Sequence, residues 1–410
     1  MNIISTNPNV MHWILYAKPW NCSKLWEKLK GAGSIARGHC DKWNQHSKPS
    51  APKMDWITEE DRGEFLKMFP SLVKELKSDK MLYGHSDVAE RFGKFLEHTV
   101  PHGKLLNSLT FVAFYKLIED PARLTPQNVH LSMILGWCVQ LLVTVFTVSD
   151  DMIDFSETRR GRRCWHLLED VGMSAINDVM FVKSGIFSIL RNHLRDHHCY
   201  LPTMELFQRY IGQLAMGQTN DTISMVKVDL LDQNTFNIDN YKATIKFKAG
   251  LLFSFPLHLA MHLSSKRDYK LLKQVDEIFI KIGSYFQSQN DFFDGFVDHS
   301  ITGKHGTDIQ EGKISWLILH AMLLASSTQK DILLQNYGKG HTKNKAAVLA
   351  VYKDLDLPKV YAQFEDDTYN ELKYDIQMIS ETSVQTFCLK VLDSIYKRYM
   401  RQYHQQLSAQ

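Results

Sequence analysis

The sequence predicts an all-α protein. From residue 54 almost to the C-terminus, apolar residues recur three and four positions apart, as they do along amphipathic helices. No segment alternates apolar and polar residues as a strand would, and no turn dipeptide joins β-branched runs. The chain has 410 residues, of which 44% are hydrophobic, enough to form a large core.

We expect one domain over residues 54–410, built from about a dozen helices. The longest helical patterns cover residues 128–155, 174–197, 203–218, 239–262, 268–297, 314–327 and 376–403. The segment NYGKGHTKNK, residues 336–345, is predicted to be a polar loop between late helices rather than a domain boundary.

Residues 1–53 differ from the rest in charge. They hold eight Lys and Arg residues against two acids, a net charge of +6, which leaves −3 for the remainder. A basic segment poor in acids is typical of a mitochondrial targeting extension, and a plain disordered tail is the alternative. The predicted location is therefore cytoplasmic or mitochondrial.

Composition argues against several other classes of protein. The formal charge of +3 gives no sign of a nucleic-acid partner. Six scattered cysteines without a CxxC pair indicate free thiols rather than a zinc site or a disulfide framework. We expect no apolar run long enough to span a membrane, and the run VQLLVTVFTV is expected to be part of a buried helix.

An acidic cluster followed by two arginines is the strongest local sign of chemistry. Asp150, Asp151 and Asp154 stand at i, i+1 and i+4, so Asp150 and Asp154 share one face of a helix. Carboxylates that close repel each other unless a cation lies between them. Mg²⁺ binds carboxylates and often substrate phosphates, and the guanidinium groups of Arg159 and Arg160 suit phosphate oxygens. The residues indicate a metal-bridged diphosphate site; the alternative is a solvated acidic helix end.

A second cluster repeats this spacing later in the chain. Asn290, Asp291 and Asp294 are followed by Lys304 and then Lys313. Two such clusters facing each other across a cavity would hold several Mg²⁺ ions against one diphosphate.

With both clusters in view, the chain resembles the trans-isoprenyl diphosphate synthases, especially the farnesyl diphosphate synthase-like members. The matching segments, between about residues 55 and 398, are SDDMIDFSETRRGRRCW, AINDV, GQTND, YKATIKFKAG, YFQSQNDFFD, TGKHGTDIQEGKISWL and IYKR. The resemblance implies an isoprenoid synthase helical bundle around a central cavity, a homodimer and a prenyl diphosphate substrate. It also implies Mg²⁺, expected as three ions, with Mn²⁺ as an alternative.

The resemblance assigns roles to individual residues. The implied metal positions are Asp150, Asp151, Asp154, Asp221, Asn290, Asp291 and Asp294. The implied contacts of the allylic diphosphate are Arg159, Lys248, Gln287, Lys304 and Lys313, of which Arg159, Lys248 and Lys304, with Asp150 and Asp154, are the expected catalytic residues. Val145 and Phe146, about one helical turn before the first cluster, are the expected floor of the prenyl-chain pocket.

The site for the second, homoallylic diphosphate departs from the family pattern. Lys104 and Arg160 are present, but Asn107 stands where the family has Arg and Val143 where it has Gln. The absence of both side chains costs about 3–4 kcal/mol, a several-hundredfold decrease in affinity. Asn290 also replaces an Asp of elongating enzymes, as in the second metal motif of terpene synthases, and Asp294 and Asp298 continue that motif's four-residue spacing.

These departures make a terpene synthase the first expectation, resembling the insect terpene synthases that derive from this fold. It would ionise an allylic substrate, farnesyl diphosphate first and geranyl diphosphate second, and release a sesquiterpene and pyrophosphate. The alternative is an isoprenyl diphosphate synthase that condenses isopentenyl diphosphate with an allylic diphosphate. A catalytically silent partner subunit is a third interpretation, against which the complete allylic site argues.

Overall fold

The computed structural model describes residues 54, 56–226, 230–232 and 236–398, all within one compact unit that spans residues 51–410. The basic extension expected at residues 1–53 lies outside the described residues. The described chain is mostly helical, which confirms the predicted all-α class.

Each of the seven predicted helical patterns contains at least one helix, but the 21-residue helix at residues 357–377 lies almost wholly outside them. The helices are α2 (Glu59–Lys77), α3 (Ser86–Thr99), α4 (Leu106–Ile118), α5 (Pro126–Ile153), α6 (Ala175–Leu194), α7 (Tyr200–Val226), α8 (Ile238–Ile245), α9 (Leu251–Leu263), α10 (Tyr269–Phe296), α11 (His299–Thr302), α12 (Asp308–Glu311), α13 (Trp316–Leu324), α14 (Ser327–Asn336), α15 (Thr342–Asp354), α16 (Leu357–Gln377) and α17 (Thr382–Ile395). The described strands are β1 (Thr158–Arg159) and β2 (Arg162–Arg163), which form a short antiparallel hairpin.

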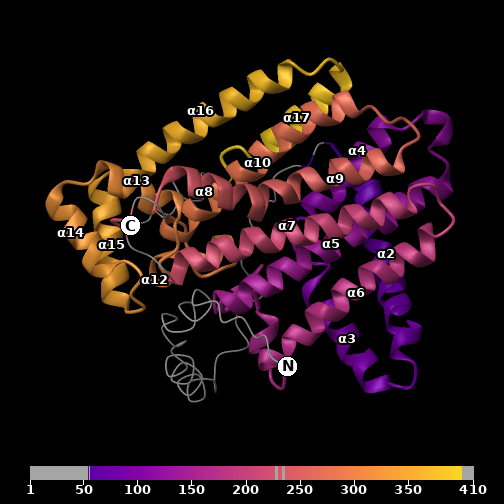
Figure 1. Cartoon of the computed structure of the whole chain (residues 1–410), viewed down its shortest axis with the longest axis horizontal. Helices are drawn as coiled ribbons and strands as arrows, with labels where there is room; N and C mark the ends of the chain where they lie inside the picture. Colours follow the sequence, from indigo (N-terminus) through magenta and orange to yellow (C-terminus); the bar gives the residue numbers. More distant parts are fainter. Residues whose placement is uncertain (1–53, 55, 227–229, 233–235, 399–410) are drawn as a thin grey trace, which may run out of the picture. The chain divides into compact units, whose positions relative to one another are not determined.

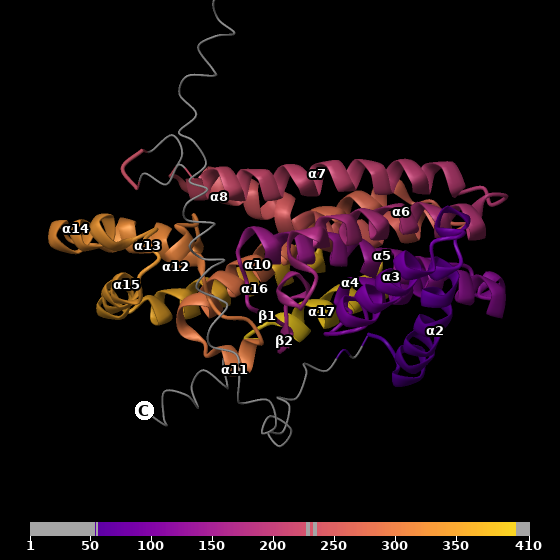
Figure 2. The ribbon, with the colours of Figure 1, turned by 90° about the horizontal axis from the view of Figure 1, so that it is seen from below.

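The long helices α5, α6, α7 and α10 run side by side through the unit, and α12–α15 gather at one end while α2 and α3 lie at the other (Figures 1 and 2). The N-terminus of α5 is capped, because the Thr125 side chain accepts a hydrogen bond from the Asn128 amide and Pro126 occupies the first turn. Its side chains are apolar on nearly every face and mostly buried, so α5 is a central helix of the bundle.

Two apolar clusters stabilise the bundle. The larger cluster joins α2–α7, α9, α10, α17 and the C-terminal part of α16. The smaller one joins the C-terminal end of α10 to α13, α15 and α16, where Phe292 stacks on Tyr361 with ring centroids 4.3 Å apart. Phe292 lies in the second acidic segment, so packing of the smaller cluster sets the orientation of that segment.

Two predicted helices are divided in the structure. The pattern over 239–262 consists of α8, a π-helical turn at Lys246–Gly250 and α9. The pattern over 376–403 is broken between α16 and α17, where Gln385 Nε2 donates to the carbonyl oxygens of Gln377 and Ile379. Apolar periodicity continues across both breaks, and for this reason it does not reveal them.

Two helical segments are long and apolar enough to cross a membrane by length and composition alone, which corrects the expectation that none would be. One is α5, 78% buried inside the bundle in its most apolar window, and the other is Gly172–Leu194, 50% buried. A buried core helix meets the same criterion, so these segments are weak evidence for a span. The four cysteines among the described residues are buried free thiols.

Candidate active site

The first acidic cluster lies at the C-terminal end of α5, where cationic side chains and an amide surround it. Asp150 accepts from Lys248 Nζ at 2.9 Å and from Gln218 Nε2 at 3.1 Å through Oδ1, and from Arg159 Nη2 at 3.2 Å through Oδ2. Burial alone would raise the pKa of Asp150, but the charges of Lys248 and the neighbouring cations outweigh burial and hold this pKa well below its usual value.

Asp154 lies one helical turn further on and is fully buried. Its Oδ2 accepts from Lys313 Nζ at 2.5 Å and lies 3.4 Å from Lys304 Nζ, and the same Lys304 nitrogen lies 3.7 Å from Asp150 Oδ2. One cation therefore bridges the two carboxylates, which confirms that Asp150 and Asp154 share a helix face.

Asp151 has a different environment from its two neighbours. Its Oδ1 accepts from Arg159 Nε at 2.8 Å and from Nη2 at 2.5 Å. Arg159 belongs to the β1–β2 hairpin, whose tight turn places Arg160 at φ 55° and Gly161 at φ 73°. Asp151 thus positions Arg159, and Arg159 in turn reaches Asp150.

Lys248 reaches this network because α7 approaches the π-helical turn closely. A Cβ at Gly217 of α7 would lie only 2.6 Å from the Lys248 amide nitrogen, so only glycine fits there. At this contact, Lys248 Nζ donates to Asp221 at 2.6 Å as well as to Asp150. π-Helical turns occur frequently at functional sites.

The second acidic cluster ends α10, and its three members face different partners. Asn290 is exposed and accepts from Arg398 Nη2 at 2.7 Å. Asp291 is buried, and its carboxylate accepts from the Tyr241 hydroxyl at 2.7 Å and the Trp316 amide at 2.9 Å. Burial raises the pKa of Asp291 to about 6, against these hydrogen bonds, which lower it.

Asp294 accepts from the backbone amides of Thr307 and Asp308, at 2.8 and 3.1 Å, and so holds the loop before α12. Gln287, one turn before Asp291, donates to Asp291 at 3.0 Å. Asp298 is exposed and caps α11. Gln287 and Asp291 line a pocket with Asp221, Lys248 and Lys313, together with Tyr241, Thr244, Ile245, Asp308, Ile314 and Ser315.

Of the residues expected at the second diphosphate, Arg160 lines a pocket together with Asp151. Gly103 (φ +97°) lies against Arg160: a Cβ there would be 2.8 Å from Arg160 Nε. Burial, followed by repulsion from Arg398, lowers the pKa of neighbouring Lys104 to about 7. Asn107 and Val143 are both half-buried, and neither lines the pocket that contains Arg160.

The proposed floor residues lie on α5. Val145 is buried in the larger apolar cluster and Phe146 packs against it. Their contacts are those of core residues, and a role in setting prenyl-chain length stays a prediction.

The donor set fits a divalent cation. Asp154 Oδ1 is buried and accepts no hydrogen bond from any residue in the described ranges. The ammonium group of Lys304 occupies the position that a metal ion between the Asp150 and Asp154 carboxylates would take. Asp150, Asp154 and Asp221 provide the oxygen ligands that Mg²⁺ prefers. Within the described ranges, no three acidic, His or Cys side chains already form a metal cage, because the lysines separate the carboxylates.

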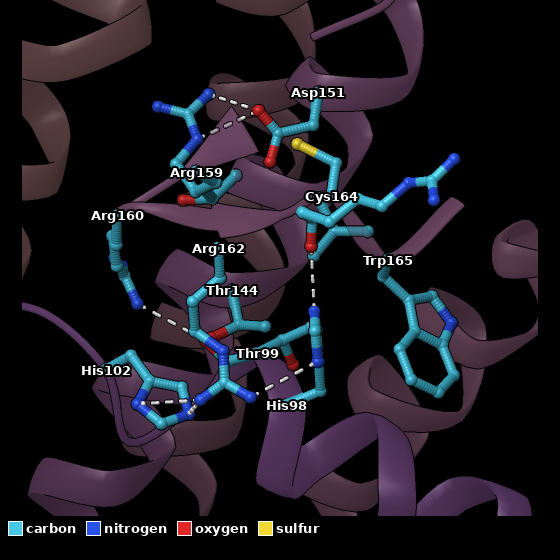
Figure 3. A pocket seen from close by; sticks show the side chains of 13 residues that line it. His98, Thr99, His102, Thr144, Asp151, Arg159, Arg160, Arg162, Cys164 and Trp165 are labelled. Atoms are coloured by element: carbon cyan, nitrogen blue, oxygen red, sulfur yellow. Dashed lines mark hydrogen bonds and ion pairs between the residues drawn. The ribbon is translucent and has the colours of Figure 1, made fainter. Parts of the chain in front are cut away.

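Three contacts of this site were not predicted from the sequence. Gln218 stands in the GQTND segment, one helical turn before Asp221, and that spacing was the available signal. Arg398 binds Asn290 from 108 positions away. Arg162, His98 and His102 meet beside Arg160, with no local pattern to indicate the contact (Figure 3).

The comparisons with known proteins agree with this geometry. The model of the polyprenyl synthetase family matches residues 89–355. The farnesyl pyrophosphate synthase of Murgantia histrionica is 35% identical over 343 residues, covering 83% of each chain. That of Bos taurus is 34% identical over 350 residues, covering 84% of this chain and 98% of its own.

A solved structure shows the same fold. Farnesyl diphosphate synthase of T. brucei, in complex with risedronate, superposes with a TM-score of 0.76 at 26% identity, covering 82% of this chain and 99% of its own. Helices, acidic clusters and sequence relatives agree: the chain belongs to the polyprenyl synthetase family, the trans-isoprenyl diphosphate synthases.

Proposed function

We propose that this chain condenses an allylic prenyl diphosphate with isopentenyl diphosphate, and that the product is farnesyl diphosphate or a prenyl diphosphate of similar length. The observation that carries this proposal is the bridging position of Lys304 between Asp150 and Asp154, with Lys248 and Lys313 alongside. The names of the relatives support elongation over the terpene synthase that the sequence departures favoured.

The allylic diphosphate would bind where these cations converge. Bound Mg²⁺ ions, which we propose as three with Mn²⁺ as a substitute, would neutralise charge on the leaving diphosphate. Asp150, Asp154 and Asp221 would hold them, and Lys248 and Lys304 would then be free to contact phosphate oxygens. Arg159, held by Asp151, would contribute a fixed guanidinium group.

The chemistry follows from that arrangement. The C–O bond of the allylic substrate breaks, the released pyrophosphate takes both electrons, and an allylic carbocation remains. The double bond of isopentenyl diphosphate attacks this cation, and loss of one proton to the pyrophosphate completes the new prenyl chain. Lys248 and Lys304 stabilise negative charge as it develops on the leaving group.

A terpene synthase is the second candidate, because Asn107 and Val143 remove two polar contacts from the homoallylic site. With that site weakened, the same carbocation would cyclise, lose a proton or react with water. The product would then be a sesquiterpene from farnesyl diphosphate. The ionisation step and its residues are the same in both proposals.

One pair of incubations separates the two functions. Protein with Mg²⁺ receives farnesyl or geranyl diphosphate alone, and in parallel an allylic diphosphate plus isopentenyl diphosphate. Volatile products and prenyl diphosphates are both quantified. Longer diphosphates that require isopentenyl diphosphate support the elongase, whereas a terpene from the single substrate without elongation would establish the synthase.

A homodimer and a cytoplasmic or mitochondrial location remain proposals, testable by light scattering and cell fractionation.

A further inference from the structure

The segment between α11 and α12, residues 303–307, carries Lys304 and contacts the protein on both sides of that lysine. We call this segment the Lys304 loop. Gly303 and Gly306 stand on either side of the lysine in the sequence TGKHGT, and neither glycine has a role in the site described above. The contacts of the two glycines fix the backbone from which the Lys304 side chain extends.

Gly303 lies against the turn of the β1–β2 hairpin. Its φ of +74° favours glycine, and a Cβ there would lie only 2.7 Å from the Gly161 nitrogen. The Gly161 amide donates a hydrogen bond to the Gly303 carbonyl oxygen at 3.1 Å. The same hairpin carries Arg159, which Asp151 holds, so this contact joins the first acidic cluster to the Lys304 loop.

Gly306 lies against the second acidic cluster. A Cβ at this position would overlap the carbonyl oxygen of Asp294 and lie 2.9 Å from its Oδ1. The Asp294 carboxylate also accepts from the amides of Thr307 and Asp308, at 2.8 and 3.1 Å. The Lys304 loop therefore connects the hairpin to α10, and a displacement of the loop at either end would move the backbone of Lys304.

Lys345 holds the same loop from α15. Helix α15 packs against α12, which directly follows the loop (Figure 1). The half-buried Lys345 donates from Nζ to the Gly306 carbonyl oxygen at 2.8 Å. A charged donor makes a stronger hydrogen bond than a neutral one. Because Gly306 has no side chain, this carbonyl oxygen is a group through which a neighbouring helix can hold it.

The position of the loop matters for the ammonium group of Lys304. Its Nζ lies 3.4 Å from Asp154 Oδ2 and 3.7 Å from Asp150 Oδ2. A lysine side chain is flexible, so the place that its ammonium group reaches depends on the backbone that carries it. Displacement of a group by about 1 Å at a site of this kind lowers the rate by up to about a hundredfold.

We propose that Lys345 is a positioning residue for the reaction. Its hydrogen bond to Gly306 holds the Lys304 loop where the Lys304 ammonium group reaches both Asp150 and Asp154. In this role Lys345 acts through Lys304 and contacts no reacting atom. The inference rests on the proposed condensation, because it assigns Lys345 to the step in which the allylic diphosphate leaves.

A double-mutant cycle tests whether Lys345 acts through Lys304. Lys345→Met removes the donor and keeps an unbranched side chain, and it is made in the natural protein and in Lys304→Met. Calorimetric titration of the full chain with inorganic pyrophosphate and Mg²⁺ measures affinity in each variant. We expect Lys345→Met to weaken binding roughly tenfold in the natural protein and less than about twofold in Lys304→Met.

Two further variants accompany the cycle. Lys345→Arg keeps a charged donor and should recover most of the affinity. Lys343→Met changes an exposed lysine on the same helix, and it should leave the affinity for pyrophosphate unchanged.

Steady-state kinetics and thermal unfolding separate positioning from a general structural role. In Lys345→Met, kcat should fall roughly tenfold while the KM for isopentenyl diphosphate stays constant. Loss of one hydrogen bond should lower the melting temperature by no more than about 4 °C.

The outcomes distinguish this inference from the proposed condensation. Natural affinity in Lys345→Met, or the same fold loss in both backgrounds, would overturn the positioning role and leave the condensation standing. Coupled losses of pyrophosphate affinity in a protein that never elongates would overturn the condensation and leave the positioning role standing.

Discussion

Arg398 donates a hydrogen bond to Asn290, with Nη2 2.7 Å from Oδ1, and so ties the end of the described chain to the second acidic cluster. The central carbon of the Arg398 guanidinium group, Cζ, lies 3.7 Å from the centroid of the Phe286 ring. Asn290 therefore has a cationic partner that competes with any metal for its single carbonyl oxygen. The three members of the cluster are not equivalent: Asp291 and Asp294 are held by the protein itself.

Asn290→Asp should strengthen metal binding at the second cluster. A carboxylate has two oxygens, so one can pair with Arg398 while the other ligates Mg²⁺. The Mg²⁺ concentration that gives half-maximal rate should fall severalfold, measured by titration of activity with the metal. Asn290→Ala should raise it, and identical metal dependence in both variants would show that residue 290 does not ligate the metal.

Asp150→Ala should strongly reduce turnover with every substrate. The change removes the acceptor shared by Lys248, Gln218 and Arg159, and with it a ligand for the metal. We expect a loss in kcat on the order of 100- to 1000-fold, as when one preorganised electrostatic contact is removed. Asp331→Asn, an exposed carboxylate on α14, is the matched control. Retained activity in Asp150→Ala would contradict the assignment of the metal site.

Gly217→Ala should damage both stability and activity. The new Cβ would lie 2.5 Å from the Phe247 carbonyl carbon, and backbone cannot give way as a flexible side chain does. Overpacking of this kind costs about 1–3 kcal/mol, and it would also displace Lys248 from Asp150. Gly212→Ala on the same helix meets no atom within 4 Å and should stabilise α7 by roughly 0.5–1 kcal/mol. Thermal unfolding and kcat of the two variants test this contrast.

Use of isopentenyl diphosphate should weaken above about pH 7. The pKa of Lys104 in the free protein is lowered to about 7, so its ammonium group, which attracts the diphosphate, is lost as pH rises through that value. The ratio kcat/KM for isopentenyl diphosphate should therefore fall between pH 7 and 8. Lys104→Arg keeps its charge throughout this range and should remove the fall. The same pH profile in Lys104→Arg would assign the titration to another group.

Asn107→Arg combined with Val143→Gln should lower the KM for isopentenyl diphosphate. The double change returns a guanidinium group and an amide to positions from which this chain lacks polar contacts. We expect the KM to fall severalfold, measured with isopentenyl diphosphate varied at a fixed concentration of the allylic diphosphate. A double variant with unchanged KM would show that neither position faces the second diphosphate.

Much of this protein is determined by local patterns that the sequence shows directly. The apolar periodicity of α5 and α10 predicts long helices, and the i, i+4 spacing of Asp150 and Asp154 predicts that both carboxylates face one cation. In the structure Lys304 Nζ lies within 4 Å of both carboxylates, and binding of a metal between them stays a prediction. These features depend only on helix geometry, which repeats every 3.6 residues whatever surrounds it.

The division of roles within each cluster was decided only by the tertiary structure. Adjacent residues on a helix point about 100° apart, so Asp151 turns to Arg159 and Asp291 turns to Tyr241 and Trp316. Which partner each carboxylate meets depends on helices far away in the chain. The contact of Arg398 with Asn290 and that of Arg162 with His102 arise in the same way, because long-range packing, not sequence spacing, brings those side chains together.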